Sequence, residues 1–290
     1  MSVAAQTTTL QVSHPAGCTD IADCTEPTIQ PLHSHELFVM PLELAVDARW
    51  VFVDRFALEL TVPLRMVHLR AHYETPGGDE FPPLDAGVHH RDETLVGLGD
   101  LGLAVRGAHL AGRWWLTLSP GFTVPTGRTQ PNPFALGDVG ERHQHVQFGT
   151  GTFNPTLKFD ATRGLPRSQV SFYAIGRMAL YENQEGFQAG PRGTLGAVIG
   201  YKAPRILASF LTEGSFEGAD RWSGAIRQDG LIGRQELRVG AQLLGRIGAT
   251  TLSGGIRVPV YRHLVEGDEP AGELRSPVSV SLGASWALNP

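Results

Sequence analysis

The sequence predicts an all-β protein, a single up-and-down antiparallel transmembrane β-barrel of about twelve strands. Three observations lead to this fold class. Apolar and polar residues alternate with period 2 in many segments, and the connections between these segments alternate between short and long. Glycine (35) and proline (20) are abundant, while the long Ala/Glu/Leu runs typical of extended helices are missing. We therefore treat residues 1–290 as one barrel domain.

The alternation is clearest between Trp114 and Val124. Trp114, Leu116, Leu118, Pro120, Phe122 and Val124 fall on one face, and Trp115, Thr117, Ser119, Gly121 and Thr123 fall on the other. One face is thus apolar and the other is mostly small and polar. Residues 278–288 repeat the pattern, with Val, Leu, Ala and Trp alternating with Ser and Gly.

The same pattern predicts nine further strands. They cover residues 36–52, 55–72, 98–109, 145–161, 168–182, 193–202, 205–217, 234–246 and 249–263. Short connections are expected at 53–54, 108–112, 163–167, 203–204 and 247–248, and long ones at 73–97, 127–144, 183–192, 218–233 and 264–276. Short turns on one side and long loops on the other are typical of outer-membrane barrels.

These segments make eleven strands in all. An odd number cannot close such a barrel with both chain ends on the short-turn side. A twelfth strand must therefore precede residue 36, and Gln6 to Val12 is the β-prone candidate. Residues 1–35 then form a first short strand and an external loop that contains both cysteines.

The location follows from what a membrane demands of a backbone. No stretch approaches the 18 or more apolar residues of a spanning helix, but a barrel strand needs only about 9–11 residues. Inside hydrocarbon a sheet must close, because every backbone N–H and C=O must be paired. A soluble sandwich or calyx would show the same alternation with its apolar face inward. Strands of ten or more residues with a Gly/Ser/Thr second face favour the bacterial outer membrane, with lipid and lipopolysaccharide as partners.

Cys18 and Cys24 lie in one polar segment and lack the second ligand pair of a zinc site. A disulfide is the favoured interpretation, which indicates an oxidising compartment. The first residues show no signal sequence, although Val3-Ala4-Ala5 is similar to the end of a cleaved one. We expect that the numbering begins inside such a signal.

Three short motifs add a family resemblance. They are Gly97-Leu98-Gly99-Asp100-Leu101, Val124-Pro125-Thr126-Gly127, and Gln147-Phe148-Gly149-Thr150-Gly151 followed by Asn154-Pro155. In this order the chain resembles the outer-membrane proteins named after the meta-pathway of phenol degradation, well over 98–160 and loosely elsewhere. The resemblance implies a barrel of roughly twelve strands and a channel for hydrophobic or aromatic molecules; the family has no catalytic residues to transfer. The end of the chain, Ala287-Leu288-Asn289-Pro290, departs from the aromatic terminus usual in such barrels.

Charged residues on the polar face are expected to line the lumen, since a charge facing lipid costs about 2–4 kcal/mol at mid-depth. The candidates are Glu43, Glu59, Arg65, Asp100, Arg106, Lys158, Arg177, Glu236, Arg238 and Arg257. They either hold the lumen together by ion pairs or form a narrow selective pore, with Arg65, Lys158, Arg177 and Arg257 facing Glu43 and Glu59.

Histidines gather in or beside the predicted long loops. Three pairs have spacings that let both imidazoles reach one Zn²⁺ or Cu²⁺, namely His33 and His35, His89 and His90, and His143 and His145. Solvent-facing histidines without a metal are the simpler alternative.

Other function classes find little support. The sequence has no Gly-x-Ser-x-Gly elbow, Walker loop or His-Glu-x-x-His motif, so an enzyme is not expected. A net charge of −5 does not favour nucleic acid as a partner. We expect a porin-like Gram-negative channel for small solutes, hydrophobic or aromatic ones included, with no cofactor. The alternative is a structural or metal-binding (Zn or Cu) barrel with histidine-rich external loops.

Overall fold

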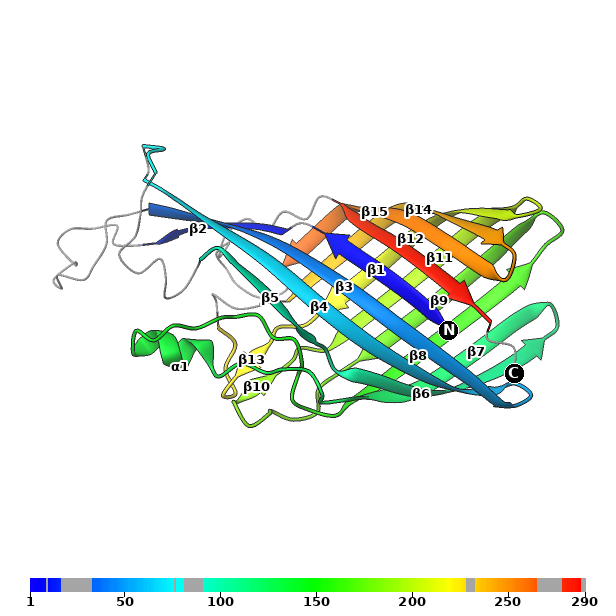
Figure 1. Cartoon of the computed structure of the whole chain (residues 1–290), viewed down its shortest axis with the longest axis horizontal. Coiled ribbons are helices and arrows are strands. Elements are labelled where there is room, and N and C mark those ends of the chain that lie inside the picture. The colour runs from blue at the N-terminus through cyan, green and yellow to red at the C-terminus, as the bar shows by residue number, and fades with distance from the viewer. Residues whose placement is uncertain are drawn as a thin grey trace.

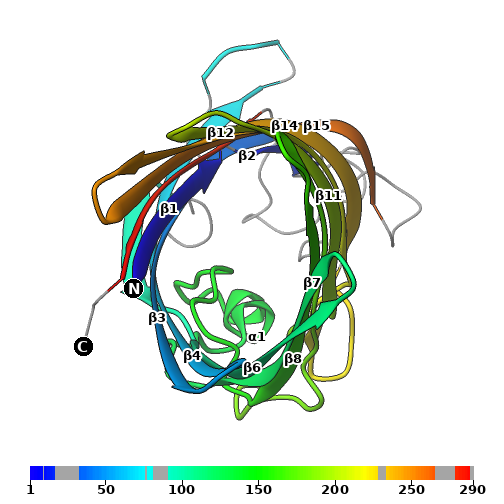
Figure 2. The same cartoon turned by 90° about the vertical axis from the view of Figure 1, so that its right-hand side faces the viewer.

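The computed structural model describes residues 1–8, 10–16, 33–75, 77–80, 91–227, 233–264 and 278–287. Its strands form one closed antiparallel barrel, seen from the side in Figure 1 and along its axis in Figure 2. The sheet closes because β1 (Ser2–Thr8) pairs with both β3 (His33–Val53) and β16 (Ser279–Trp286). Among the described residues of the ring every strand has a partner on both sides, as a sheet in hydrocarbon requires.

Twelve strands make up the ring. From β3 they continue through β4 (Phe56–Glu74), β6 (Leu101–Ala111), β7 (Trp114–Val124), β8 (Asn154–Gly164), β9 (Ser168–Arg177), β11 (Arg192–Lys202), β12 (Ile206–Glu217), β14 (Arg234–Ile247) and β15 (Thr250–Leu264). β2 (Leu10–Ala16) follows β1 along β3, and β5 (Glu93–Leu98) precedes β6 along β4. The two short strands β10 (Phe187–Gln188) and β13 (Arg221–Trp222) pair with each other, and the helix α1 (Pro133–Asp138) lies in a long loop. The predicted fold class and strand number are confirmed.

The apolar row of each strand faces outward. Leu195, Ile199, Leu243 and Leu282 are between 58% and 68% exposed, whereas Ser119 on the opposite row is only 1% exposed. A soluble sandwich would bury the first set and expose the second. The outer surface is therefore the apolar one, which matches a barrel surrounded by lipid acyl chains.

The tight turns lie together at one end, on the right of Figure 1. Arg55, Gly112 and Gly248 adopt positive φ angles of 75°, 61° and 60° in three of these turns. The beginning of β1 and the end of β16 lie at the same end, because Ser2 pairs with Ser285 and Thr250 pairs with Trp286. The prediction of a twelfth strand before residue 36 is thus confirmed.

Several predicted boundaries are wrong. The strand expected over 145–161 begins only at Asn154, and the strand expected over 168–182 ends at Arg177. Residues 145–153 alternate like a strand. Their polar groups bond to other loop residues instead of a neighbouring strand: Thr150 N donates to the Asp100 carboxylate, and the Gln147 side chain accepts from Gln130 N. Helix α1 was not expected; Asn132 caps it by accepting hydrogen bonds from Phe134 N (3.1 Å) and Ala135 N (3.3 Å). Cys18 and Cys24 lie outside the described residues, so their disulfide stays a prediction. No helix in the described ranges is long and apolar enough to cross a membrane.

Candidate functional site: the barrel lumen

Nine of the ten predicted lumen residues lie on the inward row of their strands. Cross-strand partners share a face, and the pairs Glu43 with Arg65, Glu59 with Ala104 and Lys158 with Ser119 all belong to the row that carries the small polar residues. The same parity holds for Arg106, Arg177, Glu236, Arg238 and Arg257. Asp100 differs, because it lies between β5 and β6 and takes part in a buried loop network.

A water-accessible vestibule occupies the short-turn end of the lumen. Its volume is about 660 Å³. The lining comes from both sides of the ring and includes Ser2, Asp47, Arg106, Lys158, Arg246 and Thr251. Because β8 and β15 lie across the barrel from each other, the cavity spans the lumen itself. This end of the path is open to small molecules.

The wall formed by β3, β4, β6, β7 and β8 carries balanced charges. Glu59 forms ion pairs with Arg49 at 2.8 Å and with Arg106 at 3.5 Å, and Glu43 forms one with Arg65 at 2.8 Å. We call this surface the balanced wall. It also contains Asp47, which accepts a hydrogen bond from the Thr61 hydroxyl at 2.7 Å, and Asp160, which accepts one from the Thr117 hydroxyl at 3.0 Å.

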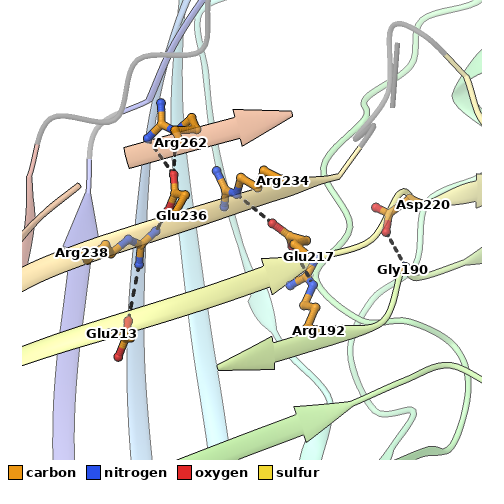
Figure 3. Close-up of polar contacts among 9 residues, drawn as sticks. All are labelled: Gly190, Arg192, Glu213, Glu217, Asp220, Arg234, Glu236, Arg238 and Arg262. Atoms are coloured by element: carbon orange, nitrogen blue, oxygen red, sulfur yellow. Dashed lines mark hydrogen bonds and ion pairs between the residues drawn. The ribbon is translucent and has the colours of Figure 1, made fainter. Parts of the chain in front are cut away.

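The opposite wall, formed by β9, β11, β12, β14 and β15, is dominated by arginine (Figure 3). Glu217 lies between two of them, with Arg192 Nε at 2.7 Å and Arg234 Nε at 2.9 Å. These three residues are cross-strand neighbours on β11, β12 and β14, so the register itself brings the charges together. We call this surface the arginine wall.

Two more glutamates on the arginine wall are shared in the same way. Glu236 pairs with Arg238 and, at 2.7 Å, with Arg262. Glu213 accepts a hydrogen bond from the Tyr173 hydroxyl and lies 4.0 Å from both Arg238 and Arg257. Of these residues the sequence prediction contained Glu236, Arg238 and Arg257.

The sequence reasoning missed most of the arginine wall. The missed members are Tyr173, Arg192, Glu213, Glu217, Arg234 and Arg262. Period 2 could have found them, since each takes the inward parity of its strand. Several lie close to strand ends, where the sequence leaves open whether a charge belongs to the wall or to the loop.

The long-loop end of the lumen is covered. Residues 125–153, which we call the mouth loop, carry α1; Figure 1 places α1 at the long-loop end and Figure 2 shows it within the outline of the barrel. Phe148 is 2% exposed and packs on Val67 and Leu69 of β4, while Arg65 Nη1 donates to the Phe148 carbonyl at 2.8 Å. The mouth loop is therefore attached to the inner surface of the balanced wall.

A second apolar cluster joins the mouth loop to its neighbours. Phe134 of α1 packs with Phe187 and Trp222, which belong to β10 and β13. Phe187 and Trp222 have ring centroids 4.8 Å apart. Three loops thus share one small core over the mouth of the barrel.

The family-like motifs meet at Asp100. Its carboxylate accepts hydrogen bonds from Gly127 N at 3.0 Å, Thr150 N at 2.8 Å and the Thr150 hydroxyl at 2.6 Å. Asn154, 1% exposed, donates to the Thr123 hydroxyl at 2.9 Å. We call this network the Asp100 knot; it ties both ends of the mouth loop to the start of β6.

Glycine is required in the Asp100 knot because the backbones touch. A Cβ on Gly149 would lie 2.5 Å from the Gly127 carbonyl oxygen and 2.6 Å from Asp100 Oδ1. No side chain fits there without moving the loop. The Gly-rich motifs are thus packing requirements of the mouth loop.

Another buried carboxyl lies in the loops at this end. Asp220 Oδ1 accepts a hydrogen bond from Gly190 N at 2.7 Å (Figure 3). Burial raises the pKa of Asp220, and the hydrogen bond from Gly190 together with the nearby Arg192 opposes part of that effect.

The structure describes the side chains of two of the six predicted metal ligands, His143 and His145. His89 and His90 lie outside the described residues, as do the side chains of His33 and His35. His143 and His145 have ring centroids 5.4 Å apart, and His143 Nδ1 lies 2.8 Å from the Glu141 carbonyl oxygen. Within the described ranges, no group of three or more His, Cys, Asp or Glu residues gathers as a metal site would. Zinc or copper binding by the loop histidines stays a prediction.

Fold and lumen together define an outer-membrane β-barrel. The chain belongs to the family described as "MetA-pathway of phenol degradation", whose model matches residues 47–256. The predicted family membership and outer-membrane class are thereby confirmed. No curated protein matches the sequence significantly.

Solved structures show the same architecture. A crystal structure of an outer-membrane channel from Pseudomonas putida F1 is similar with a TM-score of 0.58 and 11% identity, over 98% of this chain and 93% of that one. A FadL homologue from Pseudomonas aeruginosa has a TM-score of 0.43 and 10% identity, over 98% and 90% of the chains. The CymD monoaromatic hydrocarbon channel has a TM-score of 0.43 and 6% identity, over 99% and 88%. The first likeness shows a shared fold, and the other two are too distant to add to it.

Proposed function

We propose that this protein is a passive outer-membrane channel that admits small solutes, aromatic compounds included. One observation carries the proposal: a closed barrel whose outside is greasy encloses a charged lumen with an open vestibule of about 660 Å³ at one end. A purely structural anchor has no need for a hydrated interior path. Lipid and lipopolysaccharide would surround the outward row, where the apolar side chains lie.

The family description supports the aromatic part of the proposal. The family is described by a phenol-degradation pathway. Twelve strands leave a narrow interior once side chains fill it, so small planar molecules are the solutes that suit it.

Single-channel recording on the purified, detergent-folded protein tests this function. We expect discrete conductance steps in planar bilayers and swelling of proteoliposomes in small sugars or aromatic acids. Heat-modifiable migration on a gel confirms that the barrel is folded before each recording. Folded protein that gives neither conductance nor swelling would favour the alternative of an anchor with exposed loops.

A further inference from the structure

The arginine wall carries more positive than negative charge toward the long-loop end. Three glutamates lie there among the described inward residues, namely Glu213, Glu217 and Glu236, and six arginines surround them. The arginines are Arg177, Arg192, Arg234, Arg238, Arg257 and Arg262. Each of these carboxylates is shared between two guanidinium groups, and although the loop carboxylates Asp100 and Asp220 also lie near Arg177, so does Arg65 of the balanced wall, so arginine remains in excess.

The exposed fractions of the side chains show which charge faces the lumen. The side chain of Glu236 is 0% exposed and those of Glu213 and Glu217 are 12% and 13% exposed, whereas Arg192 is 41% exposed and Arg234 is 22% exposed. Arg238 and Arg262 are 17% exposed and Arg257 is 21% exposed, so the arginine is the more exposed member of every pair. The accessible surface of this wall is therefore cationic.

Two arginines are arranged in a way that an anion would relieve. Arg177 on β9 is the direct cross-strand partner of Arg192 on β11, on the same inward face. Like charges in directly opposed positions of a sheet are destabilising. Arg257 adds to this, because its Nε is buried without a hydrogen-bond partner among the described residues and its distance to Glu213 is 4.0 Å.

An apolar surface adjoins the cationic one. Ile175 lies on the same inward row, two residues from Arg177, and is 44% exposed. Its cross-strand partners on that row are Thr194 on β11 and Lys158 on β8, so the apolar contact is this one side chain among polar ones. A ligand with an acidic group and a small hydrophobic body would satisfy both surfaces at once.

We propose that the arginine wall binds small organic carboxylates, with the acid group between Arg177 and Arg192 and the hydrocarbon part on Ile175. The planar guanidinium fork matches a carboxylate geometrically and stays charged at every physiological pH. The Glu43–Arg65 pair of the balanced wall has the opposite exposure, since the Glu43 side chain is 45% exposed and the Arg65 side chain 30%. This inference rests on the proposed channel function and names the solute class.

Equilibrium binding tests the site without requiring conduction. Benzoate and benzyl alcohol are titrated into the detergent-solubilised full chain, and affinity is measured by calorimetry or saturation-transfer NMR. We expect benzoate to bind more tightly than benzyl alcohol and Arg192→Gln to weaken benzoate about tenfold, the effect of losing one charge-assisted hydrogen bond. Arg177→Gln serves as the second variant, because the ion pairs of Glu217 with Arg192 and Arg234 remain intact in it.

Two further variants separate this site from a general charge effect. Arg49→Gln removes the same charge from the opposite wall, where Arg49 is 53% exposed, and is expected to leave benzoate affinity unchanged. Glu217→Gln removes the competing internal carboxylate and is expected to tighten benzoate binding, an effect that a merely structural role would not produce.

The outcomes distinguish this inference from the channel function. Equal affinity for benzoate and benzyl alcohol would overturn it, and so would unchanged benzoate binding in both Arg192→Gln and Arg177→Gln. If the folded barrel conducts but binds no benzoate, the channel function holds and the carboxylate site fails. If it binds benzoate in the expected variant order but does not conduct, the site holds and the channel function fails.

Discussion

The two ends of the barrel lumen are built on different principles. At the long-loop end, loops fold over the mouth and bury the Asp100 knot, where Asn154 and Thr152 are 1% and 0% exposed. At the short-turn end, ion pairs such as Arg49 with Glu59 line an open vestibule. The Asp100 knot is dry and tightly packed, and the vestibule is wet.

This difference determines what a substitution costs at each end. A buried polar group that loses its partner keeps the full desolvation penalty, about 1–3 kcal/mol, whereas an exposed ion pair contributes about 0–1 kcal/mol. Changes at the long-loop end should therefore open or unfold the mouth. Changes at the short-turn end should alter charge with little effect on structure.

The largest effect is expected from Gly149→Val. Its Cβ would overlap the Gly127 carbonyl oxygen at 2.5 Å, so the mouth loop cannot dock in its present position. We expect single-channel conductance to rise severalfold while heat-modifiable migration stays normal, because the strands are untouched. Ala135→Val at an exposed position of α1 is the matched control. Unchanged conductance in the Gly149 variant would show that the mouth loop does not restrict the path.

Asp100→Ala should have the next largest effect. It removes the acceptor of the hydrogen bonds from Gly127 N, Thr150 N and the Thr150 hydroxyl, so buried donors lose their partner. We expect faster proteolysis within the mouth loop and a moderate gain in conductance. Asp100→Asn retains one acceptor oxygen and should lie between the wild type and Asp100→Ala. An identical digestion rate in all three proteins would contradict a latching role for Asp100.

The contrast between the two ends also explains what the sequence could predict. Strand parity is repeated along the whole barrel, so the fold, the number of strands and the inward position of residues such as Glu43 and Lys158 follow from period 2 alone. Each of these predictions depends only on residues two apart. Such local patterns are what a sequence displays directly.

The mouth loop depends on contacts that are distant along the chain. Asp100 bonds to Thr150, 50 residues later, and Arg65 donates to the Phe148 carbonyl, 83 residues later. The segment before Asn154 was therefore misread as strand, because Gly149 and Gly151 alternate with Thr in a loop that no local rule identifies. The pairing of charges on the arginine wall was missed for a related reason, since it depends on the register between strands.

A smaller, pH-dependent effect is expected from Asp220→Asn. Burial raises the pKa of Asp220 in the folded protein, so folding disfavours its carboxylate form. Wild-type stability should then fall as pH rises from the usual range of aspartate through the raised pKa, because the unfolded chain loses this proton first. Asparagine keeps an acceptor for Gly190 N and has no proton to lose.

Urea unfolding followed by gel mobility measures the Asp220 effect. The Asp220→Asn variant should match the wild type below the usual aspartate pKa and become the more stable protein as pH approaches neutrality. A difference that is largest in acid would reverse the sign and show that the carboxylate is stabilised in the fold.

The smallest effect is expected at the wet end, from Arg49→Gln. Arg49 is 53% exposed and shares Glu59 with Arg106 at 3.5 Å, so the remaining guanidinium still partners the carboxylate. We expect the free energy of unfolding measured in urea to change by less than about 1 kcal/mol, and conductance for neutral solutes to stay the same. Only the ion preference of the vestibule should shift toward cations, because one positive charge is removed from its lining. A loss of stability comparable to that of Asp100→Ala would show that both ends of the lumen are equally dry.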